Sequence, residues 1–163
     1  MDNGITYPVW NQTSPLGSND YRITNPPGYE QTYKAAILAL NKKYSDNWLL
    51  SASLTWSRNT GLNNIAYSAG NFGKDPNDLV NSTGLLQFDR LWMFKVQAGY
   101  NFPWDIMASL NYVYQTGTPL FTLVRIFGLN QDPPDTGRTI MAEPRSDDKR
   151  LKAWSMLGFR LEF

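Results

Sequence analysis

The chain has 163 residues, of which 42% are hydrophobic and 14% aromatic, and its formal net charge is +1. It contains no cysteine and no histidine, which excludes disulfides, thiol or imidazole catalysis, and zinc sites built from those ligands. The near-neutral charge offers no basic surplus for nucleic acid, and no run approaches the 18 apolar residues of a transmembrane helix.

Residues 1–30 contain several prolines and glycines and show no sustained hydrophobic periodicity, so we predict a loop region. Residues 31–163 are predicted to hold the strands. The start of the chain has neither the basic region nor the apolar core of a secretory signal. If the strands belong in an outer membrane, that absence predicts that the chain is incomplete.

The first predicted strand covers residues 33–43, where Ala36, Leu38 and Leu40 alternate with Ile37, Ala39 and Asn41. Alanine and leucine also favour a helix, which is the competing prediction. We prefer a strand because only a turn-prone tetrad, residues 44–47, separates it from the next strand and would close a hairpin.

The second predicted strand, Trp48 to Trp56, has two faces of opposite chemistry. Its even-numbered positions are apolar, whereas Ser51, Ser53 and Thr55 give the other face hydroxyl groups. Strict alternation is the period of a β-strand. Eight residue steps, projected for a tilt of about 40°, span roughly 20 Å, near the height of the apolar band of an outer-membrane barrel.

Residues 57–87 are rich in Asn and Gly and are predicted to form a loop of about 30 residues, which is uncommon in a compact soluble domain. The third strand is predicted over residues 88–102. Its polar positions include Lys95 and Gln97, which would be costly to bury in a dry core without partners. A polar barrel lumen removes that cost.

A tight turn at residues 103–105 leads to a fourth predicted strand over residues 106–115. The second long excursion follows at residues 117–149. Within it, the apolar run 120–127 and the stretch 138–143 are predicted either to extend the flanking strands or to form a hairpin of their own. The charged run 145–150 is predicted to be a solvated cluster. The last strand, residues 151–163, carries Arg160 and Glu162 on one side, where they can pair.

The connections therefore alternate between short and long, as tight periplasmic turns and long extracellular loops do in outer-membrane barrels. We predict an all-β fold, an antiparallel transmembrane β-barrel segment of about five strands with two long extracellular loops. On this interpretation residues 1–30 are an extracellular loop region and residues 31–163 a partial barrel. Five strands cannot close a barrel, so the barrel is incomplete.

The two faces give two candidate sets of functional residues. The lipid-facing girdle is predicted to comprise Trp48, Trp56, Trp92, Tyr100, Phe102, Tyr112 and Tyr114. The lumen-facing set is predicted to comprise Ser51, Ser53, Thr55, Lys95, Gln97, Asn111, Arg160 and Glu162.

Several stretches resemble, in order, the barrels of TonB-dependent outer-membrane receptors, especially the type with a carboxypeptidase-regulatory-like N-terminal domain. They are residues 33–57, Asp89-Arg90, Tyr114 to Pro119, Ala142 to Arg145, and Leu157 to Glu162. The resemblance covers roughly residues 30–163. It implies a 22-stranded barrel in the cell outer membrane of a Gram-negative bacterium, an N-terminal plug, and nutrient uptake driven by the TonB system. The implied partners are outer-membrane lipid, the rest of the barrel and plug, and the TonB system.

Other functions remain as alternatives: another outer-membrane barrel, such as a porin or an adhesin, or a soluble β-sandwich that binds carbohydrate. Asp75, Asn77 and Asp78 are oxygen-rich as calcium sites are, but without EF-hand spacing a solvated loop is the preferred interpretation. No carboxylate pair is placed by its spacing as a catalytic pair. We predict no enzyme activity, no cofactor, no metal site and no nucleic-acid partner.

Overall fold

The computed structural model describes residues 6–13, 30–62, 75–130 and 137–163. Five long strands stand out: β1 (Gln31–Ser45), β2 (Trp48–Leu62), β4 (Trp92–Asn101), β5 (Met107–Gln115) and β8 (Trp154–Glu162). Shorter elements are η2 (Pro76–Leu79), β3 (Thr83–Leu85), β6 (Leu123–Ile126) and β7 (Arg138–Met141). The predicted all-β, antiparallel class with about five long strands is confirmed.

The chain divides into two compact units, each of which is described by itself. The strand unit comprises Tyr33–Asn59, Phe88–Pro119 and Arg150–Phe163. The loop unit comprises Met1–Thr32, Thr60–Gln87 and Leu120–Lys149. No helix among the described residues is long and apolar enough to cross a membrane.

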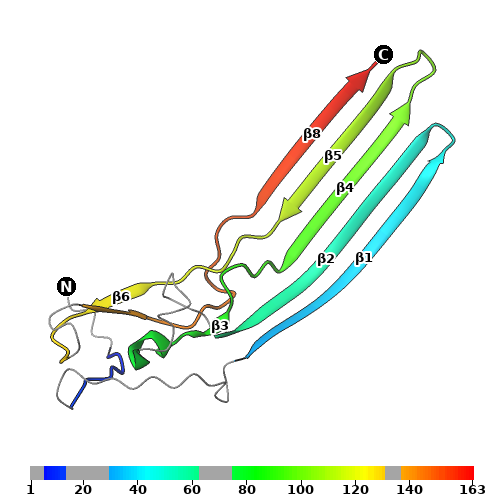
Figure 1. Ribbon diagram of the computed structural model, residues 1–163. Coiled ribbons are helices and arrows are strands. Elements are labelled where there is room, and N and C mark those ends of the chain that lie inside the picture. The colour runs from blue at the N-terminus through cyan, green and yellow to red at the C-terminus, as the bar shows by residue number, and fades with distance from the viewer. Residues whose placement is uncertain (1–5, 14–29, 63–74, 131–136) are drawn as a thin grey trace. The chain divides into compact units, whose positions relative to one another are not determined.

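The long strands form one sheet in the order β1-β2-β4-β5-β8 (Figure 1). Each long strand pairs with the next long strand along the chain, and the pairs β2 with β4, β4 with β5, and β5 with β8 are antiparallel. The sheet is open, because β1 and β8 are its two edges and do not pair with each other.

Two short turns connect strands at one end of this sheet. Between β1 and β2 only Asp46 and Asn47 intervene, with φ of 52° and 67°. Positive φ at both central residues is the signature of a type I′ hairpin turn, which Asn and Asp tolerate. The helix alternative for residues 33–43 is therefore wrong. The turn between β4 and β5 is closed by the Phe102 amide donating to the Ile106 carbonyl at 2.8 Å.

Three strand boundaries differ from the sequence prediction by three residues or more. β2 continues six residues beyond Trp56, so the predicted start of the loop at Ser57 was wrong. The extension is held by backbone pairing, including the Ser57 amide with the Leu91 carbonyl at 3.1 Å. β4 begins at Trp92 rather than residue 88, and β8 at Trp154 rather than residue 151. A strand can continue through polar residues as long as its backbone amides and carbonyls are hydrogen-bonded to a neighbouring strand.

The loop unit has the molecule's apolar core. All the described hydrophobic residues that are buried lie in it: Val80, Leu85, Leu86, Ile140 and Met141. β6 and β7 pair with each other in antiparallel register, with Val124 opposite Ile140. Of the two predictions for this excursion, the separate two-stranded sheet is therefore the correct one.

Candidate functional site: two faces of one sheet and the clamp at its end

The register gathers the predicted apolar residues of successive strands onto one face of the sheet. Trp48 lies opposite Tyr100, which lies opposite Ala108 on the next strand. The rows that follow are Leu50-Ala98-Leu110-Phe159, Ala52-Val96-Tyr112-Leu157 and Leu54-Phe94-Tyr114-Ser155, ending with Trp56 opposite Trp92. Six of the seven predicted girdle residues share this face. The seventh, Phe102, follows β4 and packs edge-on against Tyr100, with ring centroids 4.8 Å apart.

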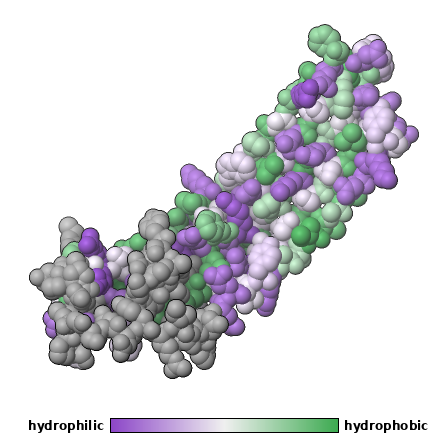
Figure 2. Space-filling view, in the orientation of Figure 1, coloured by the Kyte–Doolittle hydropathy of each residue, from purple (hydrophilic) through white to green (hydrophobic). Residues whose placement is uncertain are grey.

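The predicted lumen-facing residues gather on the other face. The rows are Leu49-Gly99-Ser109-Arg160, Ser51-Gln97-Asn111-Gly158, Ser53-Lys95-Val113-Met156 and Thr55-Met93-Gln115-Trp154. Glu162 lies opposite Met107, and its carboxylate forms an ion pair with the Arg160 guanidinium. Figure 2 shows hydrophilic patches interspersed with hydrophobic ones over the long strands. That the two faces contact lipid and lumen stays a prediction.

Within the strand unit, no other described element covers either face of the sheet. Within the five long strands Gly99 is the one residue that is buried, while Trp48 and Leu54 each keep 37% of their surface exposed. A β-sandwich would bury alternate residues of each strand, because a soluble sheet must pack one face on another layer. The strands of this unit alternate apolar and polar residues as sandwich strands do, but within the unit no second described layer packs on the sheet.

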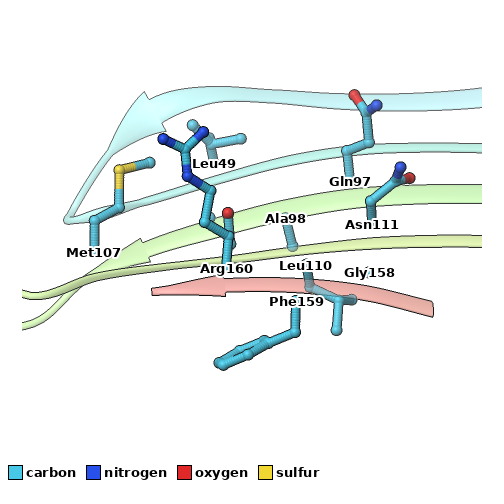
Figure 3. Close-up of a pocket in the computed structure, with 11 residues that line it drawn as sticks. Leu49, Gln97, Ala98, Met107, Leu110, Asn111, Gly158, Phe159 and Arg160 are labelled. Atoms are coloured by element: carbon cyan, nitrogen blue, oxygen red, sulfur yellow. The ribbon is translucent and has the colours of Figure 1, made fainter. Parts of the chain in front are cut away.

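A shallow hollow of about 430 Å³ lies around the two glycines of the polar face. In Figure 3, Gln97, Asn111 and Arg160 project from one side of the strands, and Leu110 and Phe159 from the other. Gln97 and Asn111 are directly opposite and exposed, and within the described residues their side chains have no hydrogen-bond partner. The polar groups that line the hollow are the side-chain amides of Gln97 and Asn111, the Ser109 hydroxyl and the Arg160 guanidinium.

A buried ion pair lies at the end of the strand unit opposite the short turns. The Asp89 carboxylate is fully buried, accepts from the backbone amide of Asn59 at the end of β2, and pairs with the Arg150 guanidinium. Arg150 also donates to the carbonyl of Gly117, at 3.0 Å. We call Asn59, Asp89, Gly117 and Arg150 the clamp, because they join the segments at the ends of β2, β4, β5 and β8.

A second set of bonds ties the start of β4 to the end of β5. Thr116 accepts from the Trp92 amide at 3.0 Å, its own amide donates to the Trp92 carbonyl, and Arg90 donates to the Thr116 carbonyl at 2.9 Å. Two stretches that carried the family resemblance, Asp89-Arg90 and residues 114–119, are thus brought together at the clamp.

Sequence reasoning missed the clamp. The run 145–150 was predicted to be a solvated cluster, which is wrong for its two arginines. Arg145 is only 4% exposed in the loop unit, and its guanidinium lies 3.9 Å from the centroid of the Phe121 ring. Burial lowers the pKa of Arg145. In the sequence, the one indication of the clamp is an acidic residue, Asp89, shortly before a predicted strand. This pattern is too common to identify Asp89 as a buried residue.

The oxygen-rich stretch 75–78 in the loop unit is structural rather than a solvated loop. Asn77 is fully buried, and its side chain accepts from the Trp10 amide at 2.7 Å and donates to the Trp10 carbonyl at 2.9 Å. Asp75 caps η2 and lies 2.7 Å from the Arg138 guanidinium. Among the described residues no three acidic, His or Cys side chains group as metal ligands do.

Asp78 gives the loop unit an expected pH dependence. Burial, and secondarily the charge of Asp75, raise the pKa of Asp78, while Arg138 opposes the shift. A folded-state pKa above the unfolded one means that the folded unit binds more protons, so stability falls as pH rises from the ordinary Asp value through the raised one. We therefore expect Asp78→Asn to stabilise the loop unit at neutral pH and to remove this fall.

Hydrogen exchange of Ile140 and Met141 amides at pH 4 to 7 measures the effect, with the exposed Asp148→Asn as the control. Intrinsic exchange rates must be corrected for pH. Equal protection in Asp78→Asn and the parent chain at neutral pH would contradict the assignment.

An open antiparallel sheet with one apolar and one polar face is the form taken by a segment of a membrane β-barrel wall. The comparisons point to the same class. Over 123 residues the chain is 32% identical to the TonB-dependent transporter Oar of Myxococcus xanthus. The match covers 63% of this chain but only 12% of that transporter, so the chain corresponds to a small part of it. No family model matches the chain, and no solved structure matches it significantly.

Proposed function

We propose that this chain is part of the wall of an outer-membrane barrel, and that the parent protein is a TonB-dependent transporter taking up a nutrient with energy from the TonB system. The apolar face contacts outer-membrane lipid, and the polar face lines the lumen beside a plug domain. The rest of the barrel completes the wall. The similarity to a TonB-dependent transporter supports this proposal.

The observation that carries the proposal is the register. Four strands align their apolar positions in rows on one face, with Ser155 as a polar exception, yet no other described element of the strand unit packs on that face. Burying a Leu or Phe side chain is worth about 1.5–3 kcal/mol, so leaving these rows in water forfeits many such contributions. Acyl chains cover them at no such cost.

The aromatic residues support the same interpretation. Trp48 and Tyr100 lie at the short-turn end of the apolar face, and Trp56 and Trp92 lie at the other end. Between them the residues of β2 on this face are aliphatic, and Val96 of β4 lies opposite Ala52 in the middle row. Tyr112 of β5 also lies in this middle row, so it is not at an end of the band. Aromatic residues near both ends of an apolar band match the two interfaces of a bilayer. In this arrangement the short turns are periplasmic and the long connections extracellular.

Spin labels on neighbouring residues of β2 test the two faces. The chain has no native cysteine, so Ala52→Cys and Ser53→Cys each place a single label, at the same depth but on opposite faces. In outer membranes we expect the label at 52 to collide several-fold more with oxygen than with a water-soluble nickel chelate. The label at 53 should show the reverse preference, because it faces a wet lumen.

Labels at both positions that prefer the chelate equally would remove the lipid assignment. A label at 52 that reaches neither reagent would indicate a packed core instead. Each outcome is read by power-saturation electron paramagnetic resonance. Protease resistance of the strand unit confirms that each labelled chain has folded.

The assignment to a transporter rather than a porin or an adhesin has its own test. Sequencing the DNA that flanks the coding region should reveal a plug-coding segment upstream in the same reading frame. A complete gene without such a segment would contradict the TonB-dependent assignment and leave a passive barrel as the better candidate.

A further inference from the structure

A pocket of about 350 Å³ lies at the clamp end of the strand unit. Its walls come from the segment before β4, the end of β5 and the start of β8, all within that unit. Two of its lining residues, Arg90 and Lys152, are cations, and none is acidic. Ligand sites span about 300–1,000 Å³, so this volume suits a small ligand or one unit of a longer one.

The charge around this pocket is unbalanced. The strand unit contains nine lysines and arginines but only four carboxylates. Three of the carboxylates lie at the short-turn end of the unit: Asp46, Asp105 and Glu162. The fourth, Asp89, is already bound by Arg150. Among the described residues no carboxylate pairs with Arg90 or Lys152. The pocket therefore favours an anion, which relieves the repulsion between its two cations.

The clamp holds the pocket in shape. Arg90 is half-buried and donates to the Thr116 carbonyl at 2.9 Å, which uses one of its N–H donors. Arg150 donates to the carbonyl of Gly117, the next residue of the pocket wall, at 3.0 Å. Arg90 is thus positioned before any ligand arrives. Its remaining donors suit a carboxylate, which a guanidinium binds through two parallel hydrogen bonds.

Trp154 supplies an aromatic surface on the polar face. It lies opposite Gln115 in the last polar row, so it is not one of the aromatic residues of the apolar face. Its side chain is 48% exposed. Among the described residues, the indole of Trp154, the amide of Gln115 and the hydroxyl of Thr118 have no hydrogen-bond partner. An exposed indole beside such groups suits a sugar, whose C–H face packs on the ring and whose hydroxyls bond to amides and hydroxyls.

We propose that this pocket binds a uronic acid unit of an acidic carbohydrate. Arg90 and Lys152 bind its carboxylate, Trp154 packs on the face of its ring, and Gln115 and Thr118 bond to its hydroxyls. A neutral sugar would leave both cations unpaired, and a phosphate would leave the indole without contact. The inference deepens the proposed function, on which it rests for a polar face that lines the lumen, by naming the class of nutrient.

Equilibrium dialysis of trigalacturonate against outer membranes that contain the protein tests the proposal. We expect Lys152→Gln to weaken binding about tenfold or more, because it removes a charged donor to the carboxylate, and Lys152→Arg to restore binding. The methyl ester of trigalacturonate has the same rings without the charge, and Lys152→Gln should leave its weaker binding unchanged. Trp154→Leu should weaken the binding of both ligands.

The matched control is Lys43→Gln, which removes an exposed lysine near the opposite end of the strand unit. It should leave the affinity for trigalacturonate unchanged. Protease resistance of the strands confirms that each variant has folded.

Four outcomes would overturn the proposal. The first is no binding of trigalacturonate by the unsubstituted protein, and the second is full binding by Lys152→Gln. The third is an equal loss in Lys43→Gln, which would indicate attraction to the net charge rather than to a site. The fourth is displacement by inorganic phosphate as effective as displacement by galacturonate, which would indicate a site for anions in general.

This inference and the proposed function fail separately. If the spin label at 52 contacts lipid and a plug-coding segment is found, but trigalacturonate does not bind, the inference fails alone. If trigalacturonate binds and Lys152→Gln weakens it, but the label at 52 does not contact lipid, the membrane assignment fails and the pocket stands.

Discussion

Asp89→Ala is expected to destabilise the strand unit by about 3–5 kcal/mol, because it removes the fully buried carboxylate that pairs with the largely buried Arg150 guanidinium. The substitution also removes the acceptor for the Asn59 amide, and so loosens β2 where it continues beyond the apolar rows. The free energy of unfolding is measured by urea titration of the membrane-inserted chain, followed by protease protection of the strands.

The matched control for this prediction is Glu162→Ala. It removes the carboxylate of the Arg160 pair, whose side chains are 73% and 47% exposed, and solvent-exposed pairs contribute roughly 0–1 kcal/mol. Adding Arg150→Met to Asp89→Ala should recover part of the loss, since no buried charge remains. Equal losses for Asp89→Ala and Glu162→Ala would contradict a structural role for the clamp.

Gly117→Ala is expected to cost about 3 kcal/mol or more, since an added Cβ would lie 1.8 Å from the Leu151 carbonyl oxygen. The position of a Cβ is fixed by its own backbone, and the atom that it meets is a backbone oxygen, so no side-chain rotation relieves the clash. The Leu151 amide donates to the Thr118 carbonyl at 2.9 Å, and this bond is expected to break. The same urea titration measures the loss.

Gly158→Ala is the control, because its added Cβ meets nothing closer than the Asn111 carbonyl oxygen at 3.8 Å. It lies mid-strand, where alanine is accommodated as easily as glycine. A Gly117→Ala chain as stable as Gly158→Ala would show that the segments after β5 and before β8 are not in close contact.

The strands could be predicted because their signal is local. Alternation from Trp48 to Trp56 assigns the two faces of β2, and the Asp46-Asn47 pair allows the tight turn before it. Boundaries were less accurate for a physical reason. Hydrophobicity stops at Trp56, but backbone pairing continues to Leu62, because polar residues also form ladders when a partner strand is present.

The clamp could not be predicted, because its members are separated by about 30 residues at each step and come from four different segments. Charged residues in a run such as 145–150 appear solvated from the sequence. Whether one of them is buried depends on where a distant carboxylate lies, and Asp89 occupies that position for Arg150. Asn77 is similar, since its burial depends on the remote segment that contains Trp10.

The sequence by itself determined that this protein is built of antiparallel strands with one apolar and one polar face, joined by alternating short and long connections. The reason is that the alternation of apolar and polar residues, which defines such a strand, can be read from neighbouring positions in the sequence. Only the tertiary structure decided that the rows align across four strands, that no other described element of the strand unit covers either face, and that both edges run in the same direction. Register, burial and edge direction are relations between segments far apart in the chain, and such relations exist only once the backbone has paired.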